Sequence, residues 1–82
     1  MYYVYIVRCK DESLYTGVST DINRRIRQHN HSKYGAKSVR GKRPVKLVYK
    51  ESYRNKSKAY KREKEIKGWT REKKLELIQC LH

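Results

Sequence analysis

The sequence predicts an α+β domain, in which a small antiparallel or mixed sheet is packed against helices. Three observations support this class. β-Branched and aromatic runs are typical of strands, apolar residues recur at helical spacing, and the elements follow the order strand, strand, helix, strand, helix, helix. A chain of 82 residues has room for one modest core, so we expect a single domain over residues 1–82.

The N-terminal part of the chain predicts a hairpin followed by a helix. Residues 2–8 (YYVYIVR) and 14–18 (LYTGV) are rich in strand-forming side chains. The short KDES turn between them favours antiparallel pairing. The segment STD then supplies helix-capping side chains, which predicts a helix from near Asp21 to near Asn30.

A long basic loop separates this helix from the remaining elements. Residues 31–44 (HSKYGAKSVRGKRP) are rich in glycine and charge, and loops of this length in compact domains are usually functional or disordered. Residues 45–53 predict a third strand, and residues 55–67 predict a second helix that ends at Gly68. Thr70 is placed to cap a third helix, whose apolar residues recur at Leu75, Ile78 and Leu81.

The strong positive charge indicates a polyanionic partner. The chain has 22 lysines and arginines against 8 acidic residues, a formal net charge of +14. Like charges repel in the compact state, and a nucleic acid would offset that repulsion and release counterions on binding. A membrane-binding helix would carry Trp, Phe and Leu opposite its basic face, but this chain has no Phe and one Trp. We therefore expect a nucleic-acid partner and no membrane.

The two cysteines indicate a reducing compartment. Cys9 and Cys80 lie near opposite ends of the chain without a CxxC motif, which does not favour a zinc site. The first residues read as a strand and resemble neither a secretory signal nor a membrane span. We therefore expect reduced thiols and a cytoplasmic protein.

Polar residues interrupt the apolar sides of two predicted helices. At about 100° per residue, Arg25 and His29 fall in the same sector as Ile22 and Ile26. In the second helix Glu63 falls beside the apolar residues, whereas Glu65 points away. The side of the first helix that is opposite to its apolar sector carries Arg24 and Arg27.

Each of these residues has a structural explanation of its own. His29 would cap a helix end, Arg25 would lay its stem over the core, and Glu63 would pair with Arg62, Lys67 or Arg25. A small core accommodates buried charge poorly, so the three together predict a polar site at the edge of the sheet.

The hairpin strands supply two tyrosines to this site. Tyr5 and Tyr15 lie on paired strands, where cross-strand aromatic packing is the alternative explanation. Gly17, inside a strand, predicts a bulge or a close approach by another group. Arginine, histidine, tyrosine hydroxyls and a single carboxylate suit phosphodiester hydrolysis with one divalent metal.

These residues resemble a known family. Val4-Tyr5-Ile6 and Tyr15-Thr16-Gly17 correspond to the two tripeptides of the GIY-YIG endonuclease superfamily. The resemblance runs from about Tyr2 to about Ile78 and is most like the small stand-alone members of bacterial type. Two further motifs of those members are present here, Gly35-Ala36-Lys37 with Arg40-Gly41-Lys42-Arg43-Pro44, and Arg62-Glu63 with Ile66-Lys67-Gly68-Trp69.

The resemblance implies a three-stranded antiparallel sheet flanked by three helices, and DNA cleavage that depends on one divalent ion, Mg²⁺ or Mn²⁺. By analogy, Tyr5 and Tyr15 position or activate the attacking water, and Arg25 stabilises the transition state. His29 is a further catalytic or phosphate-contacting group, and Glu63 is the metal ligand. The chain departs from the family pattern at Val4, Thr16 and Val18, where relatives have glycine, isoleucine and in some cases a water-activating lysine.

We therefore predict a metal-dependent endonuclease of low sequence specificity, acting on damaged, branched or single-stranded DNA in DNA repair or processing. Phosphate contacts are assigned to Arg24, Arg27, Lys33, Lys37, Arg40, Lys42 and Arg43. Two alternatives stay open: a non-catalytic nucleic-acid-binding module of the same fold, and a basic domain associated with the ribosome or with another protein. We expect a monomer or a weak dimer.

Overall fold

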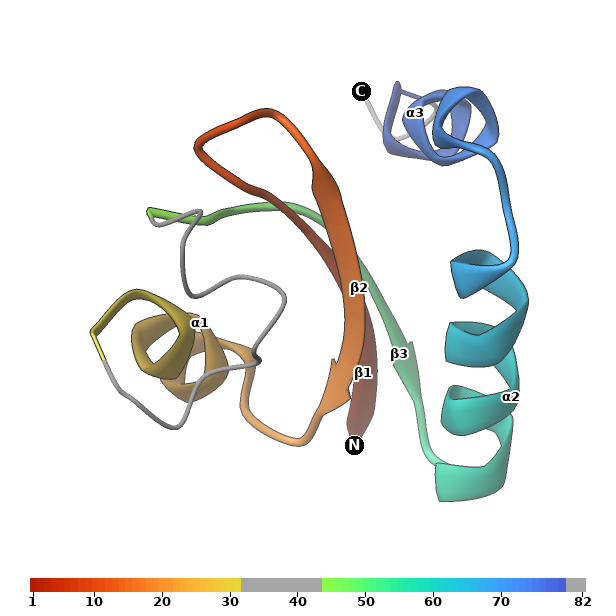
Figure 1. The fold of residues 1–82 in the computed structure, drawn as a ribbon. Coiled ribbons are helices and arrows are strands. Elements are labelled where there is room, and N and C mark those ends of the chain that lie inside the picture. Colours follow the sequence, from red (N-terminus) through yellow and green to blue (C-terminus); the bar gives the residue numbers. More distant parts are fainter. Residues whose placement is uncertain (32–43, 80–82) are drawn as a thin grey trace.

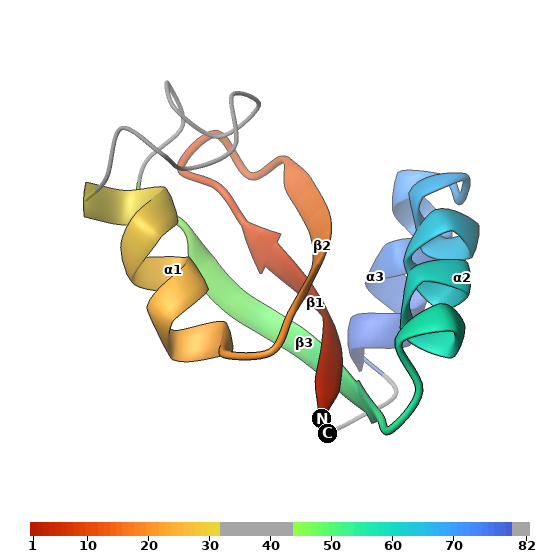
Figure 2. The ribbon, with the colours of Figure 1, turned by 90° about the horizontal axis from the view of Figure 1, so that it is seen from below.

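The computed structural model of the protein describes residues 1–31 and 44–79. These residues form three strands and three helices in the order β1 (Tyr2–Arg8), β2 (Leu14–Ser19), α1 (Ile22–His31), β3 (Lys46–Tyr53), α2 (Lys56–Lys67) and α3 (Arg71–Gln79). Figure 1 shows α1 on one face of the sheet and α2 and α3 on the other, and Figure 2 shows the same layers after a quarter turn. The predicted α+β class and the order of elements are confirmed.

The sheet is antiparallel throughout, with strand order β2-β1-β3. The central strand β1 pairs Tyr5 with Gly17 of β2 and with Lys50 of β3. A register shift between Ile6 and Val7 interrupts the pairing with β3. The sequence left two explanations for Gly17, a bulge or a close approach by another group. The register shift lies between β1 and β3, and the pairing of β1 with β2 is regular at Gly17, which leaves the close approach.

Alternation along β1 divides the described core into two layers. Tyr5, Val7 and Ile22 belong to the cluster under α1, and Val4 and Ile6 belong to the cluster under α2. The members of both clusters are almost fully buried. Successive strand residues point to opposite faces, so β1 contributes alternate residues to the cluster under α1 and to the cluster under α2.

Side-chain hydrogen bonds fix both ends of α1. Asp21 accepts a hydrogen bond from the backbone N–H of Arg24 at 3.1 Å, as an N-cap does. At the other end, the Asn30 side chain accepts from the Val45 N–H at 2.6 Å and donates to the Val45 carbonyl at 3.2 Å. This two-point clamp joins the end of α1 to the residue that precedes β3.

The second helix is fixed to both its neighbours. Asn55 caps α2 by accepting from the N–H groups of Ser57 and Lys58, and the helix ends at Gly68 as predicted. Gly68 keeps a right-handed φ of −80°, so it closes the helix without a left-handed turn. The Trp69 ring is flanked by Arg62 of α2 and Lys73 of α3, at 5.0 and 4.5 Å from its centroid.

No helix within the described ranges is long and apolar enough to cross a membrane.

Candidate active site

Tyr5 carries a polar atom from the core to the outer strand of the sheet. Its side chain has no exposed surface and packs against Val7 and Ile22. A Cβ built on Gly17 would lie 2.6 Å from Tyr5 Oη and 2.7 Å from Cζ, closer than real Cβ contacts. The tyrosine therefore lies directly across the glycine backbone, and this is the close approach that the sequence predicted.

Arg25 meets Tyr5 from the helix above this face. It is half-buried, it hydrogen-bonds to the Tyr5 side chain, and its Nη1 donates to Gln28 Oε1 at 3.3 Å. Its Nε is buried and has no hydrogen-bond partner among the described residues. A buried N–H donor without a partner is costly, so a ligand that accepts from Nε would be favoured here.

Glu63 approaches from the opposite face. Neighbouring Arg62 pairs with Glu51 of β3, so that side of α2 lies over β3 and the Glu63 side is turned toward β2. The Glu63 side chain is 17% exposed, and its carboxylate lies 3.7 Å from Lys67 Nζ. Of the three pairing partners considered from the sequence, the structure therefore selects Lys67.

The pKa of Tyr5 depends on its burial and on the neighbouring polar groups. Burial raises the pKa to about 12, although the hydrogen bond from Arg25 opposes the rise. The negative charge of Glu63, and that of the Tyr15 phenolate at high pH, also act to raise the pKa of Tyr5. Tyr5 is therefore protonated at neutral pH and is a hydrogen-bond donor there. The same interactions link Tyr5 with Tyr15, Arg25 and Glu63, which come from four different elements.

A second polar cluster lies under α2, away from this site. Glu51 accepts hydrogen bonds from Tyr49, from Tyr53 at 2.6 Å and from Arg62 Nε at 3.0 Å. Burial alone would raise the pKa of Glu51, but these donors outweigh it and hold the pKa below its usual value. Arg62 also reaches Glu65 at 2.9 Å. Every member has partners inside the fold, so this cluster ties α2 to β3.

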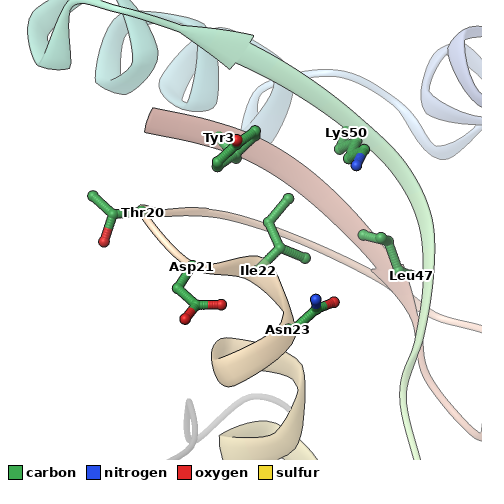
Figure 3. Close-up of a pocket in the computed structure, with 7 residues that line it drawn as sticks. All are labelled: Tyr3, Thr20, Asp21, Ile22, Asn23, Leu47 and Lys50. Carbon is green, nitrogen blue, oxygen red and sulfur yellow. The ribbon is translucent and has the colours of Figure 1, made fainter. Parts of the chain in front are cut away.

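Two adjoining hollows lie at the start of α1. The larger, about 270 Å³, is lined neither by Tyr5 nor by Tyr15, Arg25 or Glu63. Figure 3 shows Tyr3 and Lys50 on the sheet, and Asp21 and Asn23 at the beginning of α1, around it. The smaller, about 210 Å³, shares Thr20 and Asp21 with the first and includes Arg24 and Arg25. Of Tyr5, Tyr15, Arg25 and Glu63, only Arg25 lines one of these two hollows.

The other predicted site residues divide into exposed and undescribed ones. Arg24 and Arg27 are exposed on α1, on the side opposite to its buried residues, as expected. His29 lies within α1, but its side chain is outside the described part of the structure. Lys33, Lys37, Arg40, Lys42 and Arg43 are also outside the described residues.

Two residues of this region were not singled out from the sequence. Gln28 holds the Arg25 guanidinium, and its signal was the three-residue spacing on one helix. Lys50 is exposed and lies opposite Tyr5 in the register. Strand alternation would have placed Lys50 on the α1 face, because Tyr49 and Glu51 belong to the other face.

A family model matches most of the chain. The model of the GIY-YIG catalytic domain matches residues 1–76. The chain belongs to the GIY-YIG family. The residues to which the family resemblance assigned catalytic roles include Tyr5 and the three residues whose interactions act on its pKa, Tyr15, Arg25 and Glu63. Membership supports a nuclease-type function with DNA as the substrate, and GIY-YIG nucleases generally depend on a divalent metal.

Relatives of the same size share nearly the whole GIY-YIG chain. A UPF0213 protein from Staphylococcus epidermidis is 55% identical over 78 residues, which are 95% of this chain and 94% of the relative. A UPF0213 protein from Staphylococcus aureus matches with the same identity and the same coverage. The solution NMR structure of a UPF0213 protein from Bacillus halodurans is 44% identical, with a TM-score of 0.63, and the match covers 98% of this chain and 85% of that one.

Proposed function

We propose that the protein is a metal-dependent endonuclease that hydrolyses DNA phosphodiester bonds with low sequence specificity, in DNA repair or processing. One observation supports this most directly: Arg25 of α1 hydrogen-bonds to the buried Tyr5 side chain and keeps a buried Nε without a partner among the described residues. The charge of Glu63, on α2 at the opposite face of the sheet, also acts on Tyr5. A folding role alone gives no reason to bury an arginine N–H donor without a partner.

Glu63 supplies a carboxylate oxygen, the kind of ligand that a hard divalent ion prefers. Mg²⁺ is commonly held by one or two carboxylates, with waters and substrate phosphates filling the other positions. Glu63 supplies one largely buried carboxylate, and the described residues contain no group of three or more His, Cys, Asp or Glu side chains that could hold a metal. We assign Glu63 as the ligand of Mg²⁺ or Mn²⁺. When bound, the ion would polarise a phosphoryl oxygen or lower the pKa of a water.

We assign the remaining residues from their protonation and from the hydrogen bonds that their polar atoms make or lack. Tyr5 holds its proton at neutral pH, so we assign it to donate a hydrogen bond to the attacking water or to the phosphate. Tyr15 then orients the water, and the partnerless Nε of Arg25 stabilises the charge that develops on the phosphate. Hydrolysis joins the water oxygen to phosphorus, releases one proton of that water to the solvent, and breaks one phosphorus–sugar oxygen bond. The departing oxygen takes up a proton, for which His29 is the candidate donor.

Nonspecific charge provides the binding. Arg24 lines the hollow next to Arg25, and Arg27 is exposed on the same helix. Contacts of this kind position a DNA backbone without reading its sequence. We assign the same role to the loop residues Lys33, Lys37, Arg40, Lys42 and Arg43.

A matched pair of glutamates on α2 tests the proposal. Glu63→Gln is expected to abolish cleavage of supercoiled, branched and single-stranded DNA in Mn²⁺ or Mg²⁺. Glu65→Gln should cut like wild type, because Glu65 is exposed and pairs only with Arg62 among the described contacts. Equal cleavage by the Glu63 variant and wild type would refute the assignment. Salt-dependent binding without cleavage by wild type would instead favour a binding module of the same fold.

A further inference from the structure

Tyr60 is an aromatic side chain that the fold leaves exposed. It is 48% exposed, and Met1 is the other large hydrophobic side chain that is exposed among the described residues. Its neighbour Ala59 and the later Ile66 are fully buried on the same helix. Tyr60 therefore contributes little to the core, and much of its ring is available to a ligand.

The exposed ring lies on the side of α2 that carries Glu63. At about 100° per residue, Lys56, Tyr60, Glu63 and Lys67 fall within one sector of about 60°. The Lys56 ammonium lies 5.7 Å from the centroid of the Tyr60 ring, and Lys67 lies 3.7 Å from Glu63. These four residues, which we name the β2-side stripe, follow the helix for about 16 Å. Lys58 is exposed on the opposite side.

We propose that the β2-side stripe binds an unpaired nucleic-acid strand, with one base stacked on Tyr60 beside the bond to be cut. This rests on the proposed function, since it takes Glu63 as the metal ligand. Proteins bind single strands without sequence preference by combining a basic track with exposed aromatic rings, because every base has a π-face. The bases inside a duplex are stacked on one another, so their faces cannot reach the ring.

The stripe supplies both elements of such a track. Lys56 and Lys67 are exposed cations on either side of Tyr60 and Glu63. Their positive charge complements the negative charge of a phosphate backbone. The hydroxyl of Tyr60 is dispensable for stacking, whereas the ring is required. The substrate class is therefore a strand with at least one unstacked base next to the cleaved phosphate, as in a loop, a flap or a single strand.

Binding without metal tests the stripe separately from catalysis. Labelled oligothymidylate and a fully paired duplex are titrated in EDTA and followed by fluorescence anisotropy. Tyr60→Ala is expected to weaken single-strand binding by between about fivefold and about 150-fold, while duplex binding changes less than about twofold. Tyr60→Phe should bind both like wild type. Lys56→Ala should weaken single-strand binding, and Lys58→Ala, on the opposite side, should weaken it less.

The outcomes separate this inference from the proposed function. Single-strand binding by Tyr60→Ala that equals wild type overturns the stripe, as does an equal loss on both nucleic acids. Thermal unfolding verifies that the exposed substitution leaves the fold intact. If Tyr60→Ala shows the selective loss but wild type cuts no DNA in Mn²⁺, the stripe stands and the nuclease assignment fails. If Glu63→Gln abolishes cleavage and Tyr60→Ala changes neither binding nor cleavage, the nuclease assignment stands and the β2-side stripe fails.

Discussion

The contact between Tyr5 and Gly17 leads to a sharp prediction for Gly17→Ala. The added methyl would lie 2.6 Å from Tyr5 Oη and 2.7 Å from Cζ, whereas ordinary contact begins near 3.4 Å. The ring must therefore move by roughly 0.7–0.8 Å, and it has no exposed surface into which to move. Overpacking of this kind costs about 1–3 kcal/mol, and the better strand propensity of alanine offsets about 0.5–1 kcal/mol.

The expected net loss is about 1–2 kcal/mol of unfolding free energy, which for a domain of this size lowers Tm by roughly 4–16 °C. Urea unfolding followed by circular dichroism measures the loss. Gly68→Ala is the matched control, because its Cβ would meet the Glu65 carbonyl at an ordinary 3.5 Å and Gly68 has a right-handed φ. It should unfold within about 0.5 kcal/mol of wild type.

A double-mutant cycle tests the cause of the loss. In a Tyr5→Leu background the three crowding atoms Oη, Cζ and Cε1 are absent, so Gly17→Ala should cost nothing further. If Gly17→Ala were as stable as Gly68→Ala in the wild-type background, the reasoning about the ring would be refuted. Where cleavage is observed, a displacement approaching 1 Å of a positioned group should also lower the rate by about 10²-fold.

Three other substitutions test separate contacts. Asn30→Ala should lower unfolding free energy by about 1–3 kcal/mol, since it leaves the buried Val45 N–H without its partner; Asn23→Ala, exposed on the same helix, should not. The hydrogen bonds to Glu51 lower its pKa below that of the unfolded chain, so they stabilise the fold above the unfolded pKa, and this stability is lost as pH falls through the folded value. Glu51→Gln should therefore cost at least about 1.5 kcal/mol at pH 7 and flatten the acid limb of stability against pH. Unchanged pH dependence would contradict that role. Lys67→Ala should tighten Mn²⁺ binding up to about fivefold in calorimetry, because it removes a competing cation from Glu63; Lys64→Ala is the control, and equal effects would exclude the competition.

The sequence predicted the features that depend on local patterns. Strand alternation, capping side chains and helical spacing are properties of short segments, and Asn55 and Gly68 bound α2 as expected. The same spacing separated the half-buried Arg25 from the exposed Arg24. These assignments succeed because each depends on residues within a few turns of one another.

Features that depend on the packing of distant elements were not predictable in the same way. The sequence indicated a close approach at Gly17 but could not identify Tyr5 as its cause, because that requires the register of the hairpin. The choice of Lys67 as the partner of Glu63 follows from the engagement of Arg62 by Glu51, a contact eleven residues apart. The opposite faces taken by α1 and α2 result from the path of the chain around the sheet.

The outer position of β2 explains how helices on opposite faces contribute to one site. In the order β2-β1-β3 the centre of the sheet separates α1 from α2, so their polar side chains can meet only around an edge. Gly17 leaves β2 without a side chain where Tyr5 crosses it, which makes room for the buried Tyr5 hydroxyl over β2. Arg25 is held on this side by Gln28 and Tyr5, while its buried Nε keeps no partner among the described residues. The consequence is that Tyr5 serves the core and the site together, so substitutions at Tyr5 or Gly17 should change stability and chemistry in parallel, whereas Glu63→Gln should change chemistry with little effect on stability.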